Sequence, residues 1–295
     1  MRSSGRIRLA AFGRGAEKIV SRSTSAEVRY LNKEWKGRPE PPRIGDAESR
    51  RAVTHKRRVA IDDVRGQALD LDTSGFILTR HESTLPSFRK REDVVGIYYE
   101  EIGRFVRGLS GADRVFVEGH TVRTEDARGF NAAYARYVHC DYSLADNGAD
   151  RRDIVERRYD QDLGSGTRWE FAWYNTWQPI DFPAHRNPLA VIDARTLDRD
   201  DVVDYWYAGP RARPLPARPG KPTDASLSSM PVFNPRQRFC YFPQMRTDEI
   251  MVFKQLDTRP DRAPGCPHTS FDIDAPPDAP PRRSIEVRVV CAFAC

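Results

Sequence analysis

A histidine and an aspartate stand two positions apart in the segment Tyr137–Tyr142, which reads YVHCDY. Alternate side chains of a β-strand share a face, so in a strand His139 and Asp141 would point the same way and Cys140 the opposite way. An imidazole nitrogen and a carboxylate oxygen placed like this can bind one metal ion. The alternative is a structural hydrogen bond between a buried histidine and its neighbouring acid, and the pair alone does not separate the two.

A metal site of this kind needs a second histidine from a distant part of the chain, and His268 in GCPHTSF is the natural candidate. Two histidines and one carboxylate on one face of a metal leave three positions open, as in non-haem Fe(II) oxygenases. His120 is the reserve ligand, and no catalytic side chain is expected beyond the metal ligands. Cys140 and Cys266 lie near the ligands in sequence but are expected to be packing residues, because thiolate ligation would make a softer site.

Fourteen residues after the second histidine, the sequence PPRRSIEVRVV places Arg282 and Ser284 on one face of a predicted strand and apolar residues on the other. A guanidinium binds a carboxylate through two hydrogen bonds, and a serine hydroxyl adds a donor. The distal carboxylate of 2-oxoglutarate requires such a site, while its keto-acid end would chelate iron. Arg288, on the same face, and Arg283, in a shifted register, are the alternatives to Arg282. For Arg288 we prefer a salt bridge with Glu286 or another acid.

Short strands dominate the predicted elements after a helical N-terminal part. A helix is predicted over Glu92–Leu109 and ends at Gly111; its apolar face is formed by Val94, Val95, Ile97, Tyr98, Ile102 and Phe105. Shorter helical segments are predicted over residues 124–135 and 150–159, with a turn over 247–250. Strands are predicted over residues 26–31, 58–62, 75–78, 114–123, 168–177, 189–193, 204–207, 238–242, 251–256, 268–272 and 284–293. This order predicts a mainly β fold with flanking α-helices, a jelly roll or related barrel.

Several longer segments carry a family resemblance. They are YARYVHCDYS, NTWQPI, YFPQMRTDEIMVFKQLDT and PHTSFDIDAPPDAPPRRSIEVR, with weaker matches at GFILTRHEST and GADRVFVEGHTVR. Together they cover roughly residues 26–292, and the chain resembles the AsaB-like hydroxylase/desaturase family, which includes gibberellin desaturases and cephem methoxylase components. The resemblance implies a cupin-like double-stranded β-helix, Fe(II), 2-oxoglutarate, O2 and oxidation of a small metabolite. By position, it assigns His139, Asp141 and His268 to the metal, and Arg282 with Ser284 to the co-substrate.

Pocket residues are predicted less directly. Asn175, Trp177 and Tyr241 are candidates for the cavity beside the iron, although an aromatic-rich strand such as WEFAWYNTW is more often simply core. Two departures from the family pattern stand out. Gln178 occupies a position where a basic residue is expected, and Arg283 one where an acid is common. We expect the first to alter substrate or co-substrate contacts.

Composition narrows the remaining possibilities. The 295 residues carry a formal charge of +6, with arginines and acids interspersed, which disfavours nucleic acid as a partner. No run is apolar for the ~18 residues of a membrane span, so no membrane partner is expected. Five cysteines without close pairing favour a reducing, cytoplasmic setting. Residues 1–25 are predicted to be an extension and 26–295 a single domain with a Pro-rich surface loop over 209–222; the oligomeric state is left open.

Three hypotheses follow. The first is an Fe(II)/2-oxoglutarate-dependent oxygenase that hydroxylates or desaturates a small secondary metabolite. The second is a cupin-like metal-dependent isomerase or hydrolase, which would keep the metal ligands but have no use for Arg282. The third is a non-catalytic basic binding module, which the scattered arginines and acids disfavour.

Overall fold

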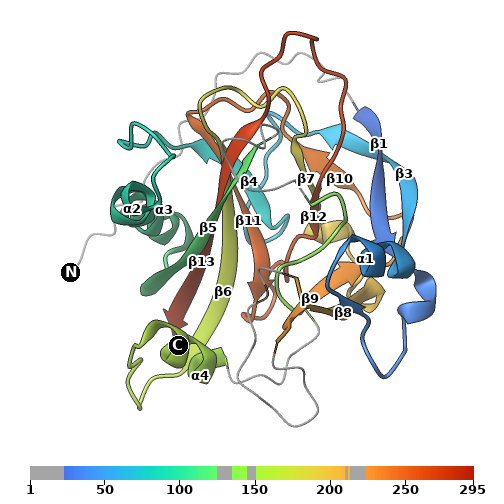
Figure 1. The fold of residues 1–295 in the computed structure, drawn as a ribbon. Coiled ribbons are helices and arrows are strands. Elements are labelled where there is room, and N and C mark those ends of the chain that lie inside the picture. Colours follow the sequence, from blue (N-terminus) through green and yellow to red (C-terminus); the bar gives the residue numbers. More distant parts are fainter. Residues whose placement is uncertain (1–22, 125–134, 145–150, 210–211, 213–223) are drawn as a thin grey trace.

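Two five-stranded sheets curl against each other in the computed structural model, which describes residues 23–124, 135–144, 151–209, 212 and 224–295 (Figure 1). The first sheet has the order β1-β3-β10-β7-β12 and the second the order β4-β11-β6-β13-β5. The strands of the first are β1 (Ser23–Leu31), β3 (Thr54–Asp63), β10 (Phe239–Tyr241), β7 (Leu189–Ile192) and β12 (His268–Ser270). Those of the second are β4 (Phe76–Arg80), β11 (Glu249–Asp257), β6 (Trp169–Pro179), β13 (Arg283–Ala294) and β5 (Arg114–Thr124).

A buried cluster lies between the two sheets and joins them. It contains Val191 and Cys240 from the first sheet and Trp177, Met251 and Phe253 from the second. Two packed, curled sheets with helices outside them confirm the mainly β jelly-roll prediction.

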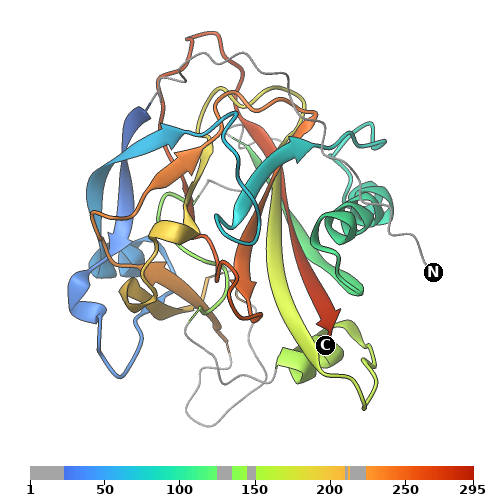
Figure 2. The same cartoon turned by 180° about the vertical axis from the view of Figure 1, so that it is seen from behind.

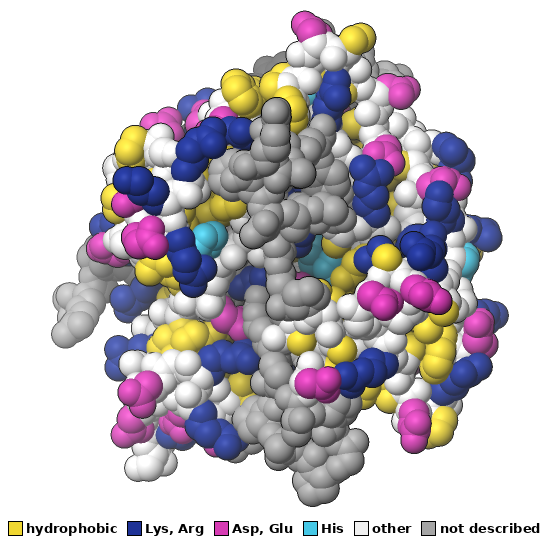
Figure 3. Space-filling view, in the orientation of Figure 1, with side chains coloured by type: hydrophobic (Ala, Val, Ile, Leu, Met, Phe, Trp, Pro, Cys, Tyr) yellow, Lys and Arg dark blue, Asp and Glu magenta, His cyan; other side chains and the backbone are white. Residues whose placement is uncertain are grey.

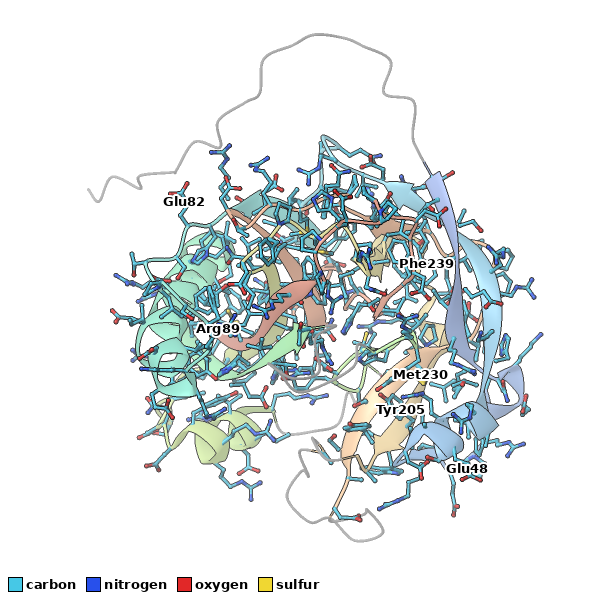
Figure 4. All side chains as sticks on the ribbon, turned by 45° about the horizontal axis from the view of Figure 1, so that its top comes forward. Glu48, Glu82, Arg89, Tyr205, Met230 and Phe239 are labelled. Carbon is cyan, nitrogen blue, oxygen red and sulfur yellow. The ribbon has the colours of Figure 1, made fainter. Side chains whose placement is uncertain are left out.

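A small third sheet extends one end of the fold. It has the order β2-β8-β9 and is built from β2 (Arg43–Ile44), β8 (Val202–Tyr207) and β9 (Ser226–Pro231). Tyr205 and Met230 from neighbouring strands belong to one buried cluster on this sheet (Figure 4). Neither β2 nor β9 was predicted; β2 has only two residues, and β9 follows a Pro-rich stretch and lacks clear alternation.

The helical region lies on the outer face of the second sheet (Figures 1 and 2). Its run consists of α2 (Arg91–Asp93), a π-helical turn (Val94–Tyr98) and α3 (Tyr99–Ser110), and it ends at Gly111 with a left-handed φ of 70°. The predicted helix and its C-terminal glycine are therefore confirmed.

The buried face of this helix differs from the predicted one. The buried stripe is Val94, Tyr98, Ile102 and Val106, whereas Val95 and Ile97 are 41% and 39% exposed. A regular α-helix with 3.6 residues per turn would bring 94, 95 and 98 toward one side. The π-turn widens the helix at this point, so only every fourth residue faces the sheet.

Strand β13 shows the predicted two-faced pattern. Ile285, Val287 and Val289 are buried in the cluster that includes the helix. Ser284, Glu286 and Arg288 alternate with them and are also buried. The polar side of the strand must therefore face the space between the sheets.

Other elements complete the described part of the chain. They are α1 (Ala47–Val53), α4 (Arg151–Tyr159), which was predicted, and short 3-10 turns at Lys33–Trp35, Ala194–Thr196 and Arg199–Asp201. The predicted helix over 124–135 falls almost wholly outside the described residues, as do residues 1–22 and most of the predicted loop over 209–222. Among the residues that the structure describes, no helix has the length and apolar character needed to cross a bilayer.

Gly75, which precedes β4, lies close to Cys266, two residues before His268, and this close approach can be tested by mutation. Its φ is +84°, and a Cβ built on it would lie 2.5 Å from the Sγ of Cys266. Gly66 has nearly the same φ, +81°, with nothing within 4 Å of its built Cβ. We expect Gly75→Ala to lower the free energy of unfolding by about 2–4 kcal/mol, and Gly66→Ala by about 1–2 kcal/mol, because only the first adds a clash to the backbone cost. Urea denaturation of both variants measures these free energies of unfolding. Equal decreases would show that the Cys266 side chain moves to relieve the clash without cost.

Candidate metal centre

Two histidines and one aspartate meet between the sheets. One potential ligand atom from each of His139, Asp141 and His268 lies within 4.8 Å of the others. The segments that carry them are joined by main-chain hydrogen bonds between His139 and His268, with N–O distances of 3.1 and 2.8 Å. Residues 137–142 form no regular strand, since only His139 and Cys140 make isolated bridges, to His268 and Ser229. Those bridges are enough to hold the three side chains together.

Both imidazoles are oriented and buried. His139 Nδ1 lies 2.9 Å from the carbonyl oxygen of Tyr137, and its Nε2 lies 3.7 Å from Asp141 Oδ1. The ring centroids of His139 and His268 are 4.4 Å apart. Burial lowers the pKa of His139, and burial together with the neighbouring His139 lowers that of His268 well below its usual value. Neutral imidazoles are the form that binds metals.

Asp141 is favoured in its ionised form although its side chain is only 12% exposed. Burial opposes its charge, but the adjacent Arg288 guanidinium outweighs this and holds the pKa of Asp141 well below the usual range. Arg288 Nε donates to Asp141 Oδ2 at 2.7 Å, and Asn175 Nδ2 donates to the same oxygen at 2.8 Å. The carboxylate is therefore available as an anionic ligand.

Gln255 ties the two metal-binding segments to the second sheet. It lies at a β-bulge in β11, where the pairing with β6 shifts between Lys254 and Leu256. Its Oε1 accepts a hydrogen bond from the backbone N–H of Asp141 at 2.8 Å, and its Nε2 lies 3.3 Å from His268 Nδ1. A bulge re-aims one side chain out of the regular alternation, and here it directs an amide between two predicted ligands.

A cavity opens beside the two histidines, with about 270 Å³ of empty space counting its open mouth. Its lining consists of Arg123, Ala135, His139, Trp177, Leu189, His268, Ser270, Arg282 and Glu286. Arg282 is 2% exposed, donates to the carbonyl oxygen of Asn187, and has its guanidinium carbon 5.6 Å from the Trp177 ring centroid. The Oγ of Ser284 is fully buried and makes no hydrogen bond to any described residue.

Two of the three predicted pocket residues lie at the site. Trp177 lines the cavity. Asn175 contacts Asp141, and its Oδ1 is buried without a hydrogen-bond partner among the described residues. Tyr241 is not brought there: it packs edge-on against Phe271, in a cluster on the other side of the first sheet. Its neighbour Cys240 is the residue that faces the sheet interface.

Gln178 points away from the cavity, and its amide bonds to residues on the helix side of the second sheet. Its Oε1 accepts from the Tyr98 hydroxyl at 2.7 Å, and its Nε2 donates to the carbonyl oxygen of His81 at 3.0 Å. The physical reason is strand alternation: Trp177 faces inward, so its neighbour must face the helix.

Two of the alternatives, Arg283 for the co-substrate and His120 for the metal, lie away from the cavity. Arg283 pairs with Asp181 at 2.6 Å, and His120 Nδ1 lies 2.9 Å from the Tyr99 hydroxyl. Cys140 and Cys266 are buried in apolar clusters, where burial raises the pKa of both thiols, as expected of packing residues.

Sequence reasoning missed three residues of this site. For Arg288 a salt bridge with Glu286 or another acid was preferred, and its ion pairs with Glu286 at 3.2 Å and Asp141 at 2.7 Å agree with this; its position beside a metal ligand was not foreseen. Glu286 itself lines the cavity. The alternation of β13 could have signalled Glu286, whereas no local signal pointed to Gln255.

A jelly roll that brings two histidines and one carboxylate together between its sheets has the arrangement typical of non-haem Fe(II) oxygenases. The chain belongs to the family described as "Oxidoreductase/YMDC permease-like domain", whose model matches residues 28–292.

Named relatives agree with the resemblance found in the sequence. The alpha-ketoglutarate-dependent dioxygenase phiK from a fungal species is 29% identical over 250 residues, which is 80% of this chain and 84% of that protein. The hydroxylase/desaturase efuI from Hormonema carpetanum is 28% identical over 295 residues, 92% of this chain and 95% of that protein. The solved structure of the iron and alpha-ketoglutarate-dependent endoperoxidase NvfI superposes with a TM-score of 0.73 at 23% identity, covering 92% of this chain and 98% of that one. The expected fold and the likeness to hydroxylase/desaturase proteins are thus confirmed.

Proposed function

We propose that this protein is an Fe(II)/2-oxoglutarate-dependent oxygenase that hydroxylates or desaturates a small secondary metabolite. The observation that carries the proposal is the convergence of His139, Asp141 and His268 from remote parts of the chain. The lowered pKa of each group favours neutral imidazoles and an ionised carboxylate, the forms that bind a metal. These residues fit Fe(II) and would hold it. With 2-oxoglutarate and O2, bound Fe(II) supplies the oxidation of an unactivated C–H bond, while the co-substrate becomes succinate and CO2.

Arg282 and Ser284 would bind the distal carboxylate of 2-oxoglutarate. The guanidinium of Arg282 lies in the cavity wall and is almost fully buried. A buried hydroxyl without a partner costs free energy, and Ser284 Oγ is one, so a ligand oxygen beside it would relieve that cost. Trp177 and Leu189 add apolar wall to the same cavity and would limit the access of water.

The class of partner and the cellular compartment proposed for the enzyme rest on its surface charges and its amino-acid composition. Cationic and anionic side chains are interspersed over the face shown in Figure 3, which supports a small molecule rather than a nucleic acid or a membrane as the partner. Five cysteines without close pairing in sequence support the cytoplasm. We treat residues 26–295 as one oxygenase domain that follows an N-terminal extension.

Binding of the co-substrate to iron tests the proposed function. Added anaerobically to the purified protein with Fe(II), 2-oxoglutarate is expected to give a weak visible charge-transfer band. Glutarate, which lacks the keto group, should give none, because only a keto acid can chelate the metal through two oxygens. In air, the same sample should convert 2-oxoglutarate to succinate when an accepted substrate is present. A protein that binds no Fe(II) and forms no band would contradict the proposal.

A further inference from the structure

The protein holds the side chain of Asp141 by one oxygen only. Oδ2 accepts two hydrogen bonds, from Arg288 Nε at 2.7 Å and from Asn175 Nδ2 at 2.8 Å. Oδ1 makes no hydrogen bond within the described part of the chain and lies 3.7 Å from His139 Nε2. The two oxygens of this carboxylate are therefore not equivalent before any metal arrives.

The backbone of Asp141 is held as well. Its N–H donates to Gln255 Oε1 at 2.8 Å, and its carbonyl oxygen accepts from Ser228 Oγ at 3.1 Å. Oδ1 is thus the single polar atom of Asp141 left for a ligand by the described residues.

Arg288 is itself fixed from two sides. Its Nη2 lies 3.2 Å from Glu286 Oε1 while its Nε is engaged by Asp141, and its side chain is 10% exposed. A planar guanidinium that donates to one carboxylate and lies within ion-pair distance of a second has little freedom to rotate, so it can impose an orientation on Asp141.

We propose that Arg288 is a positioning residue, which retains Asp141 Oδ2 so that the carboxylate presents only Oδ1 to the metal and takes a single coordination position. This inference rests on the proposed function. Two histidines and one carboxylate leave three positions open for small ligands. A carboxylate bound through both oxygens would occupy one of these three open positions. Binding of the keto acid, which needs two positions, would then be weakened.

Arg288→Lys is the variant that tests the inference, because lysine keeps the charge but lacks the planar guanidinium that donates to Asp141 while lying beside Glu286. We expect the affinity for 2-oxoglutarate to fall by about 10–100-fold, by analogy with the loss of metal affinity or activity when an outer contact of a metal ligand is removed. The charge-transfer band of the anaerobic Fe(II) complex should weaken and shift in wavelength. Asn175→Leu removes the other donor to Oδ2 and should shift the band in the same direction by less.

Arg259→Lys is the matched control. Arg259 also makes a two-point contact with a buried acid, donating to Asp257 at 3.0 and 2.7 Å, and its guanidinium lies over the Phe293 ring away from the cavity. Arg259→Lys should leave the charge-transfer band and the affinities for Fe(II) and 2-oxoglutarate unchanged.

The outcomes distinguish the positioning role of Arg288 from the proposed function. If the wild-type protein gives the band and both Arg288→Lys and Asn175→Leu reproduce its position and 2-oxoglutarate affinity within twofold, the positioning role is overturned while the proposed function stands. If the wild-type protein binds no Fe(II), both are overturned. Should Arg288→Lys fail to fold, Asn175→Leu decides alone, because it perturbs the same oxygen and leaves the Arg288 ion pairs in place.

Discussion

Arg282→Leu is expected to abolish binding of 2-oxoglutarate while Fe(II) binding is retained. The guanidinium is almost completely buried in the cavity wall, and the partner oxygens of a carboxylate would be equally shielded from water there. Losing one partner of a buried, hydrogen-bonded charge pair costs about 2–5 kcal/mol, or roughly 30-fold and upward in affinity. Titration of the anaerobic Fe(II) protein with 2-oxoglutarate measures this directly.

The neighbouring arginine supplies the control for this change. Arg283 pairs with Asp181 and points away from the cavity, so Arg283→Leu should leave the 2-oxoglutarate affinity unaltered. Arg282→Lys should fall between the wild type and the leucine variant, since an ammonium offers a single point of contact. If Arg282→Leu binds the co-substrate normally, the protein would instead fit the cupin-like isomerase or hydrolase considered at the outset.

His268→Ala should lose Fe(II) binding almost completely. The imidazole is one of three ligand groups, so its removal must exceed the 10–100-fold loss typical of an outer contact of a metal site. The fold should survive, because the bridge between the two metal-binding segments is made by main-chain atoms of His268 and His139. Anaerobic iron titration with metal analysis of the desalted protein gives the measurement.

His120→Ala is the comparison that makes this result specific. His120 contacts the Tyr99 hydroxyl beside the helix and is absent from the group of three. The His120→Ala protein should therefore bind Fe(II) like the wild type. Stoichiometric iron in His268→Ala, or its loss in His120→Ala, would reassign the metal ligands.

The sequence was sufficient for features that depend on local periodicity. Alternation along residues 284–293 predicted both faces of β13, and the apolar steps before Gly111 predicted the helix that covers one of them. The metal group was found because one residue pair and one distant histidine fit a known ligand set, although the strand assumed around Asp141 is reduced to two isolated bridges. Alternation also predicts the direction of the Gln178 side chain: if Trp177 faces inward, its neighbour faces outward.

What could not be predicted lies in contacts across the sheet interface. Arg288 and Asp141 are 147 positions apart and meet only because β13 and the segment after β5 are packed face to face. Gln255 reaches the ligands from a bulge, which breaks the very regularity that sequence patterns report. The π-turn at Val94–Tyr98 likewise changed which side chains the helix buries.

The register of β13 has a consequence for how this family can vary. A residue added or lost between Ser284 and Arg288 would exchange the two sides of the strand beyond it, turning valines toward His139, Asp141 and His268 and charged residues toward the helix. The connection over residues 273–281 is largely exposed and lies outside β12 and β13, so its length is under no such constraint. We therefore expect the number of residues between His268 and Arg282 to vary among related chains. Insertions and deletions should occur in this connection and not in the strand that follows.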